Sequence, residues 1–532
     1  MKNRSLKLAL SLIFVFGLSS CALLYPNVST SNNDTRSLEY KFTESDKAEI
    51  DNRIANLDTL LEGDSYQDFY NSFIRVIKGD LYSVATYRNL AQLNYSIYAD
   101  STSRSKYLET TEYLNSLVKW QESFYKKIYN SKFKDEFFKD YTEEELKNLV
   151  GDTLPNEYYA LENENEKLLA EYDEISDIKT STDVPEIYRK LIKNYKLQAS
   201  YSGYNDFRDY AYKELYDRDF NKEEAITFSN YIKRYIVPLY DEKTKSFNDK
   251  YETGSNKSKR TVANYIQGSY TSFKDEFKDY AKEIGGSYYL AYNNLWDNGY
   301  YFMGNSSSSD GAYTLYLYNL STPACYFGPN YQSISTIVHE FGHYYSMLER
   351  GNSGGSLDLA ETQSQGNELL FLSYLDSNKK FLPETLSILR DYQLSEALQT
   401  IILANLVNDF ENTIYSTENI SLIDFDNLFI NTCQKYGGYD YLKELFGGDF
   451  SHYWRMVALD NPLYYISYSV GLIPAIGLYQ MGMNDFKSAS DSYNKIIIYD
   501  YNTMSFLDVL DNASLYNPFD EKSFIELSKL ND

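Results

Sequence analysis

Residues 333–345 read SISTIVHEFGHYY, and the rest of the chain is best interpreted outward from this stretch. His339, Glu340 and His343 stand in the spacing HExxH. On a helix, residues four apart lie on one face, so both imidazoles can reach one metal ion. Glu340 is placed to take a proton from a water molecule at the metal rather than to bind the metal itself. The alternative is a helix with two satisfied polar histidines. The apolar neighbours argue against it, because a buried histidine pair needs a partner.

A third ligand must come from outside this stretch, because a catalytic zinc ion takes three protein ligands and keeps one position open. The chain has only three histidines, and the last, His452, is far along the sequence. Ser346 and Glu349 occupy the positions where another class of zinc site has glycine and histidine. A carboxylate is therefore the better candidate.

Carboxylates follow in the next predicted helix. The glycine-rich residues 351–355 predict the end of the first helix, and a second is expected from about Ser356. Asp358, Glu361 and Glu368 are spaced to share one face of that helix. Three acids on one face repel each other unless a cation or a donor neutralises them. A solvated acidic stripe is the alternative, but a two-histidine helix across a short loop favours metal binding.

The combination of HEFGH at residues 339–343 and DLAETQSQGNE at residues 358–368 resembles the thimet oligopeptidase and oligoendopeptidase F family of zinc metallopeptidases. The resemblance implies one Zn²⁺ per chain, with Glu361 as its third protein ligand. It also implies that Asp358 and Glu368 orient the two histidines. Residues 203–210 and 235–239 also resemble the family, and the similarity covers roughly residues 190–530.

The fold class predicted from the chain is mainly α with a small β element. Ile50, Ile54, Leu57 and Leu61 share a helical face that opens after Thr43 and closes at Gly63. One stretch departs from this period. Residues 312–318 (AYTLYLY) are rich in β-formers and predict a strand, which must pair within a small sheet. The family resemblance adds a bilobal helical architecture with a deep substrate channel, in which this strand is an edge that pairs with substrate backbone.

The resemblance extends to residues 461–471 (NPLYYISYSVG), where it implies that Tyr465 and Tyr468 stabilise the oxyanion formed as water adds to the scissile carbonyl. The alternative is packing, since the chain has 57 tyrosines. One family feature is missing. Relatives carry a histidine shortly before this segment, where this chain has Val457 and Ala458. Losing one such donor costs about 10² in rate.

The function implied is a zinc-dependent endopeptidase that hydrolyses internal bonds of short oligopeptides, with Glu340 as general base. Two alternatives stay open. One is a catalytically weakened, peptide-binding lipoprotein of the same fold, although capture of peptides needs no general base. The other is a zinc carboxypeptidase with a glutamate ligand.

The N-terminus predicts export and anchoring. A basic start and an apolar run make residues 1–20 a signal peptide, and Leu18-Ser19-Ser20-Cys21 resembles a bacterial lipobox. Cys21 is then the lipidated residue, which places the protein on the extracytoplasmic face of the cell membrane. Residues 21–38 are a flexible tether, followed by an N-terminal helical domain over 39–190 and a catalytic domain over 191–532. A soluble secreted protein is the alternative.

The composition argues against two other classes of protein, those that bind nucleic acids and those built on a disulfide scaffold. With Lys+Arg 51 against Asp+Glu 76, the net charge of -25 argues against nucleic-acid partners, whose phosphates require clustered basic residues. Three cysteines cannot build a disulfide scaffold. If Cys21 is lipidated, Cys325 and Cys433 remain, either paired or as two buried thiols.

Overall fold

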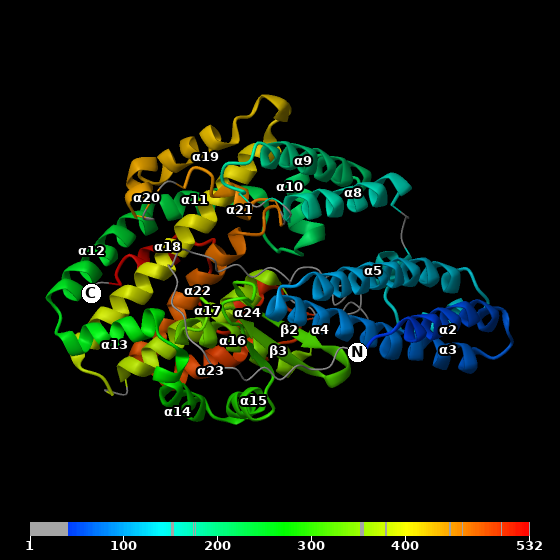
Figure 1. The fold of residues 1–532 in the computed structure, drawn as a ribbon, viewed down its shortest axis with the longest axis horizontal. Coiled ribbons are helices and arrows are strands. Elements are labelled where there is room, and N and C mark those ends of the chain that lie inside the picture. The colour runs from blue at the N-terminus through cyan, green and yellow to red at the C-terminus, as the bar shows by residue number, and fades with distance from the viewer. Residues whose placement is uncertain are drawn as a thin grey trace. The chain divides into compact units, whose positions relative to one another are not determined.

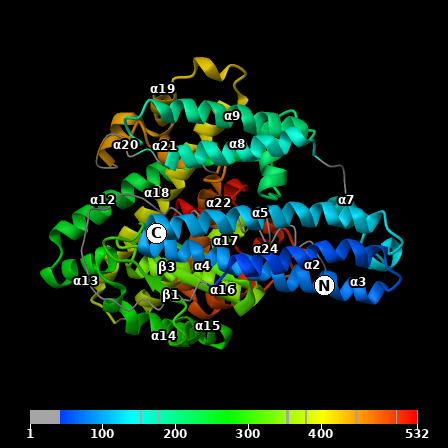
Figure 2. The same cartoon turned by 45° about the vertical axis from the view of Figure 1, so that its right-hand side comes forward.

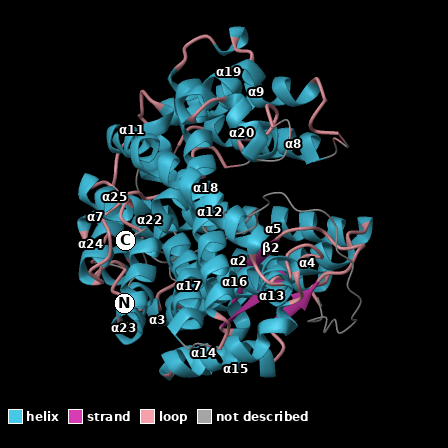
Figure 3. Ribbon diagram, turned by 90° about the vertical axis from the view of Figure 1, so that its left-hand side faces the viewer, coloured by secondary structure: helices cyan, strands magenta, loops and turns pink. Residues whose placement is uncertain are grey.

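The computed structural model describes residues 41–150, 154–173, 175, 177–351, 356–377, 380–445, 448, 450–459, 461–501 and 503–530. The predicted signal peptide, the tether and Cys21 lie outside these ranges, and so do residues 352–355 of the glycine-rich break. Helices dominate the described chain, and strands are confined to one small sheet (Figure 3). The prediction of a mainly α fold with a minor β element is confirmed.

The chain divides into two compact units that are discontinuous in sequence. The first takes the described residues within Met1–Thr153 and Asn264–Gly354, and the second takes those within Leu154–Ala263 and Gly355–Asp532. The two predicted domains, by contrast, were contiguous and met at residue 190. A single boundary cannot express this arrangement, because the chain leaves the first unit and later returns to it.

The first unit begins with helices whose ends the sequence specifies. Helix α2 (Glu44–Glu62) starts with a capping box, in which Thr43 Oγ1 accepts the Asp46 N–H at 3.3 Å and Asp46 Oδ2 accepts the Thr43 N–H at 2.8 Å. It ends at Gly63, as predicted. The following helical segments are α3 (Tyr66–Arg75), η1 (Val76–Leu81), α4 (Tyr82–Tyr98), α5 (Ser101–Tyr129), α6 (Lys134–Phe137) and α7 (Glu143–Val150). Phenylalanines and leucines from these segments form one core.

The same unit contains a three-stranded sheet and the helix with the HExxH spacing. The sheet has the order β1-β3-β2, in which β1 (Tyr301–Met303) is parallel and β2 (Ala312–Leu317) antiparallel to β3 (Thr322–Phe327). Strand β2 is thus an edge strand, as predicted. Helix α16 (Ile334–Arg350) packs against β2 and β3 (Figure 1). The unit also contains η4 (Tyr270–Phe273), α14 (Lys274–Ile284), α15 (Gly286–Asp297) and η5 (Tyr318–Leu320).

All the regular elements among the described residues of the second unit are helical. Its first part contains α8 (Asn156–Asp173), α9 (Asp183–Tyr201), α10 (Phe207–Tyr210), η2 (Ala211–Leu215), α11 (Lys222–Tyr231), η3 (Ile232–Ile236) and α12 (Val237–Thr253). Helices α8 and α9 run side by side (Figure 2). Helix α13 (Asn256–Gln267) contains the point at which the chain passes back to the first unit.

The second part of this unit is built around the helix pair α17 (Leu357–Ser377) and α22 (Ile466–Asn484), which pack closely along their lengths. Small residues permit the close approach, because a Cβ on Gly471 would lie only 2.9 Å from the Thr362 nitrogen. The other segments are α18 (Pro383–Ser416), η6 (Ile420–Leu422), α19 (Phe425–Cys433), η7 (Gln434–Tyr436), α20 (Tyr439–Leu445), α21 (Trp454–Val457), α23 (Phe486–Ile497), α24 (Phe506–Asn512) and α25 (Glu521–Leu527).

Two further questions from the sequence concern cysteines and membranes. Cys325 and Cys433 are both buried free thiols, so the two do not pair. Within the described ranges, none of the helices combines the length and the apolar character needed to cross a bilayer.

Candidate metal centre

Helix α16 presents both histidines from one buried face. The helix starts where Ser333 Oγ accepts the Thr336 N–H at 3.3 Å, and it ends before Gly351, whose φ of +62° suits a residue without a Cβ. His339 and His343 are each 6% exposed, and their ring centroids lie 5.0 Å apart. The helical spacing therefore places the two imidazoles next to each other, one turn apart.

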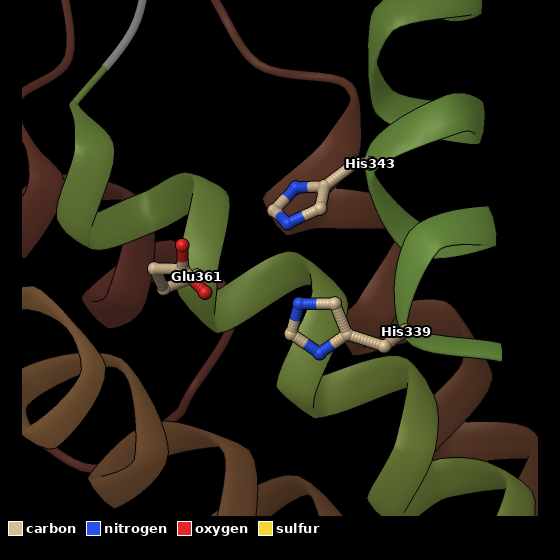
Figure 4. Close-up of side chains that lie close together, drawn as sticks. All are labelled: His339, His343 and Glu361. Carbon is tan, nitrogen blue, oxygen red and sulfur yellow. The ribbon is translucent and has the colours of Figure 1, made fainter. Parts of the chain in front are cut away.

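Glu361 supplies a carboxylate to the same place. One ligand atom from each of His339, His343 and Glu361 lies within 4.8 Å of the others, and all three residues are buried. Figure 4 shows the two imidazoles and the carboxylate gathered around a common space. Among the residues that the structure describes, this is the one group of histidine, cysteine and acidic side chains with metal-ligand proximity.

The donor set fits zinc. Two imidazoles and one carboxylate are a ligand combination of catalytic zinc sites, and tetrahedral ligands at about 2.1 Å from the ion lie about 3.4 Å from each other. The observed proximity is compatible with that spacing after small side-chain rotations. Burial, and then the neighbouring His339, lower the pKa of His343 well below its ordinary value, which keeps the imidazole neutral with a lone pair for a metal.

Glu340 is held by the edge strand. It is 3% exposed, and Thr314 Oγ1 on β2 donates a hydrogen bond of 2.7 Å to its Oε2. The same hydroxyl lies 3.1 Å from the Glu340 carbonyl oxygen and 3.4 Å from Cys325 Sγ. Thr314 lies in the predicted strand, but its residue type alone indicated no role. The sequence gives no direct indication of the contact between Thr314 and Glu340, because this contact depends on the packing of β2 against α16.

The tyrosine segment contacts Glu361 through Tyr464, which is neither of the two tyrosines predicted to act. Tyr464 Oη donates a hydrogen bond of 3.0 Å to Glu361 Oε1. Tyr465 and Tyr468 are buried beside it, and the ring centroid of Tyr468 lies 5.4 Å from that of Tyr464 and 5.6 Å from that of Tyr465. The oxyanion role of Tyr465 and Tyr468 stays a prediction.

The two acids predicted to orient the histidines lie on α17 with Glu361. Asp358 is fully buried, and its Oδ2 lies 3.6 Å from Nε of Arg218 and accepts a hydrogen bond of 3.2 Å from Ser356 Oγ. Glu368 Oε2 accepts a hydrogen bond of 3.3 Å from Gln393. Their orienting role stays a prediction. Arg218 was missed, because a single arginine between two helices has no pattern that separates it from surface arginines.

Comparison with known proteins gives a clear result for the fold. No protein-family model matches the sequence, and the search of curated proteins found no relative. Among solved structures, PZ peptidase A with a bound inhibitor superimposes with a TM-score of 0.69 at 16% identity, covering 93% of this chain and 98% of that one. A protein provisionally assigned as oligoendopeptidase F from Bacillus anthracis strain Ames gives 0.66 at 16% identity, covering 95% and 97%.

A third neighbour is a carboxypeptidase by name. Metallocarboxypeptidase 1 of Trypanosoma cruzi gives a TM-score of 0.57 at 11% identity, covering 90% of this chain and all of that one. The similarity thus extends well beyond residues 190–530 and includes the N-terminal helices. The chain has the mainly helical fold shared by the oligoendopeptidase F and PZ peptidase structures.

Proposed function

We propose that this protein is a zinc-dependent endopeptidase that hydrolyses internal bonds of short oligopeptides. The observation that carries the proposal is the buried group His339, His343 and Glu361, with Glu340 on the same helix as the two histidines. The shared fold supports it, since PZ peptidase and oligoendopeptidase F are named as peptidases.

The three ligands would hold one Zn²⁺. Bound zinc in such a site supplies a Lewis acid that polarises a peptide carbonyl and makes water more acidic. Glu340 is the group that accepts the proton of the attacking water and delivers it to the leaving amine. Thr314 donates a hydrogen bond to one oxygen of that carboxylate and so restricts its rotation. Tyr465 and Tyr468 donate to the oxyanion.

The edge strand supports the proposed substrate class. Strand β2 presents backbone groups on the side away from β3, where an extended peptide can add as a further strand without regard to its side chains. Asn89 Nδ2 donates to one of these groups, the Tyr316 carbonyl, at 2.8 Å. Short, unstructured peptides that enter a deep channel are the proposed substrates.

The proposed location is the extracytoplasmic face of the cell membrane, with a lipid on Cys21. The sequence of residues 1–21 is the support for this part of the proposal. Cys21→Ala should move the expressed protein from the detergent phase to the aqueous phase after phase partitioning. Equal partitioning of the two proteins would contradict the anchor.

Two other functions compete. A carboxypeptidase is favoured by one observation, the fold shared with the metallocarboxypeptidase of Trypanosoma cruzi. A peptide-binding lipoprotein of the same fold is the second. Glu340 weighs against it, because capture needs no general base.

The test uses a mixture of short peptides of known sequence together with casein, with and without a zinc chelator. Internal cuts in the peptides, intact casein and loss of cutting with chelator are expected. Release of single C-terminal residues would assign a carboxypeptidase, and uncut peptides that still bind would assign a binding protein. Glu340→Gln should retain zinc and lose about 10²- to 10⁴-fold in kcat. Undiminished turnover in this variant would disprove the mechanism.

A further inference from the structure

The loop before α22 contains a backbone conformation that its residue disfavours. Leu463 has φ +65°, in the left-handed region, and its side chain is fully buried. Residues other than glycine adopt this region uncommonly, and when they do so the surrounding structure must hold them there. The residue that follows is Tyr464, whose hydroxyl contacts Glu361.

Both backbone polar groups of Leu463 are hydrogen-bonded to buried side chains. Glu411 Oε1 on α18 accepts the Leu463 N–H at 2.9 Å, and Arg218 Nη1 donates to the Leu463 carbonyl at 2.9 Å. The preceding carbonyl, of Pro462, accepts a hydrogen bond of 2.7 Å from Tyr216 Oη. Three side chains from two separate segments thus fix two consecutive peptide groups.

Arg218 extends these contacts to both helices of the central pair. Its Nη2 donates to Ser467 Oγ at 2.9 Å in the first turn of α22, and its Nε lies 3.6 Å from Asp358 Oδ2 in the first turn of α17. The side chain is fully buried, and its guanidinium lies 4.5 Å from the ring centroid of Tyr216. Asp217, next to Arg218, has φ +48°, so the arginine is itself presented from an unusual backbone conformation.

Glu411 is also unusual. Its carboxyl group is fully buried, and Oε2 has no hydrogen-bond partner among the described residues. Burial raises the pKa of Glu411 well above its usual range, against the opposing effects of the Leu463 N–H and of the Arg218 charge. Burying a carboxyl group at such a cost indicates a specific purpose, and the group that Glu411 Oε1 binds is the N–H of the strained residue.

We propose that Arg218 and Glu411 are positioning residues that hold Leu463 in the left-handed conformation and thereby fix the Tyr464 hydroxyl on the carboxylate of Glu361. Hydrogen bonds to a metal-binding carboxylate orient it and tune its affinity for the metal. This inference rests on the proposed function, in which Glu361 is a zinc ligand. It assigns a role to residues that neither bind the metal nor touch substrate.

The first test compares zinc dissociation constants by competition with a chelating dye. Tyr464→Phe and Arg218→Lys should each weaken zinc binding about 10- to 100-fold, the usual effect of losing a partner of a metal ligand. Glu411→Leu should do the same. Glu411→Gln should retain most of the affinity, because its amide oxygen can still accept the Leu463 N–H. In turnover assays at saturating zinc, Arg218→Lys should lower kcat and leave KM nearly unchanged.

The second test separates positioning from general stability. Leu463→Gly and Leu463→Ala both lose the buried side chain, but only glycine adopts φ +65° without strain. In the protein that carries Leu463→Gly, the left-handed conformation of residue 463 no longer depends on its hydrogen-bond partners. Adding Arg218→Lys to this variant should therefore weaken zinc binding by less than about threefold. In the protein that carries Leu463→Ala, Arg218→Lys should still cause the full loss of zinc affinity. A role in stability alone predicts equal losses in both backgrounds.

Folding is followed by circular dichroism and by the melting temperature with chelator present. If Arg218→Lys does not fold, Tyr216→Phe replaces it, because this variant removes one hydroxyl and keeps the ring. Zinc affinity unchanged in folded Arg218→Lys and Tyr216→Phe would overturn the inference, and so would equal losses in the glycine and alanine backgrounds. A wild-type protein that binds no zinc would instead overturn the proposed function.

Discussion

Thr314 illustrates how much one hydroxyl can contribute to the proposed reaction. It is 3% exposed and donates to Glu340 at 2.7 Å, so the carboxylate proposed as general base has one oxygen fixed by the edge strand. A hydrogen bond to a charged group in a buried place is worth about 1.5–3 kcal/mol, and its loss also frees the side chain to rotate away from the reactants. The strand that is proposed to bind substrate therefore also orients the base.

Thr314→Val should lower kcat about tenfold or more, with little change in KM and in zinc affinity, because valine keeps the shape and removes the donor. Steady-state kinetics with an internally quenched peptide would measure this. Thr314→Ser is the matched control, and it should retain most of kcat. A valine variant with wild-type kcat would show that Glu340 needs no support from β2.

Single residues also mark the limit of prediction from sequence. His339, Glu340, His343 and Glu361 could be selected because a helical period and a short loop fix their relative positions. Tyr464 and Arg218 could not, because their partners lie 103 and 140 residues away along the chain. Tyr465 and Tyr468 were preferred to Tyr464 by resemblance, whereas contact with Glu361 depends on the left-handed turn at Leu463.

At the scale of elements, the pairing of α17 with α22 determines where Glu361 lies. A Cβ on Gly471 would meet the Thr362 nitrogen at 2.9 Å and the Glu361 carbonyl carbon at 3.1 Å. These are backbone atoms, which cannot rotate away as the end of a side chain can. The glycine therefore permits the close approach of the two helices at the level of the ligand.

Gly471→Ala should destabilise the protein by about 1–3 kcal/mol and also weaken zinc binding, because the shift of α22 displaces both Glu361 and Tyr464. Gly482→Ala is the matched control at the other end of the same helix pair, where the new Cβ would meet the Ser373 side chain. It should lower stability and leave zinc affinity unchanged. Equal zinc affinity in both variants would contradict the coupling of this helix contact to the metal centre.

A second element, α10, depends on a charged N-cap. Asp206 accepts the Arg208 N–H at 2.9 Å and is paired with the side chains of Arg208 and Lys222. Burial alone would raise the pKa of Asp206, but these partners outweigh it and hold the pKa well below its ordinary value. A depressed pKa in the folded state means that the carboxylate stabilises the fold above its unfolded pKa, and that this stability disappears as pH falls through the folded pKa.

The difference in unfolding free energy between wild type and Asp206→Asn should therefore be constant above about pH 5 and shrink as pH falls below about 4. Urea unfolding across this range would measure it. Asp279→Asn, in an exposed pair with Lys282 on α14, is the control and should have little effect at any pH. A difference that grows on acidification would have the wrong sign for this account.

At the scale of the whole molecule, the class of fold could be predicted from the sequence better than the division of the chain into two units. Helical periods and one β-rich stretch were enough for a mainly helical protein with a small sheet. Strands β1 and β3 were missed, since Tyr301–Met303 is too short to show alternation and Thr322–Phe327 is buried at every position. The return of the chain to its first unit near residue 264 depends on long-range packing, which no local pattern reports.

Metal binding should be visible in the stability of the whole protein. A ligand that binds only the folded state stabilises it by about 4 kcal/mol at 1,000 times its dissociation constant. The ligands come from two helices, α16 and α17, so the ion should bind the folded chain and not the unfolded one. The melting temperature should rise by several degrees on adding Zn²⁺ to chelator-treated protein, measured at one scan rate, and Mg²⁺ should not reproduce the rise.

His343→Ala should abolish the shift while leaving the melting temperature of the apoprotein nearly unchanged. An identical zinc-dependent rise in this variant would place the bound ion somewhere other than the His339, His343 and Glu361 group.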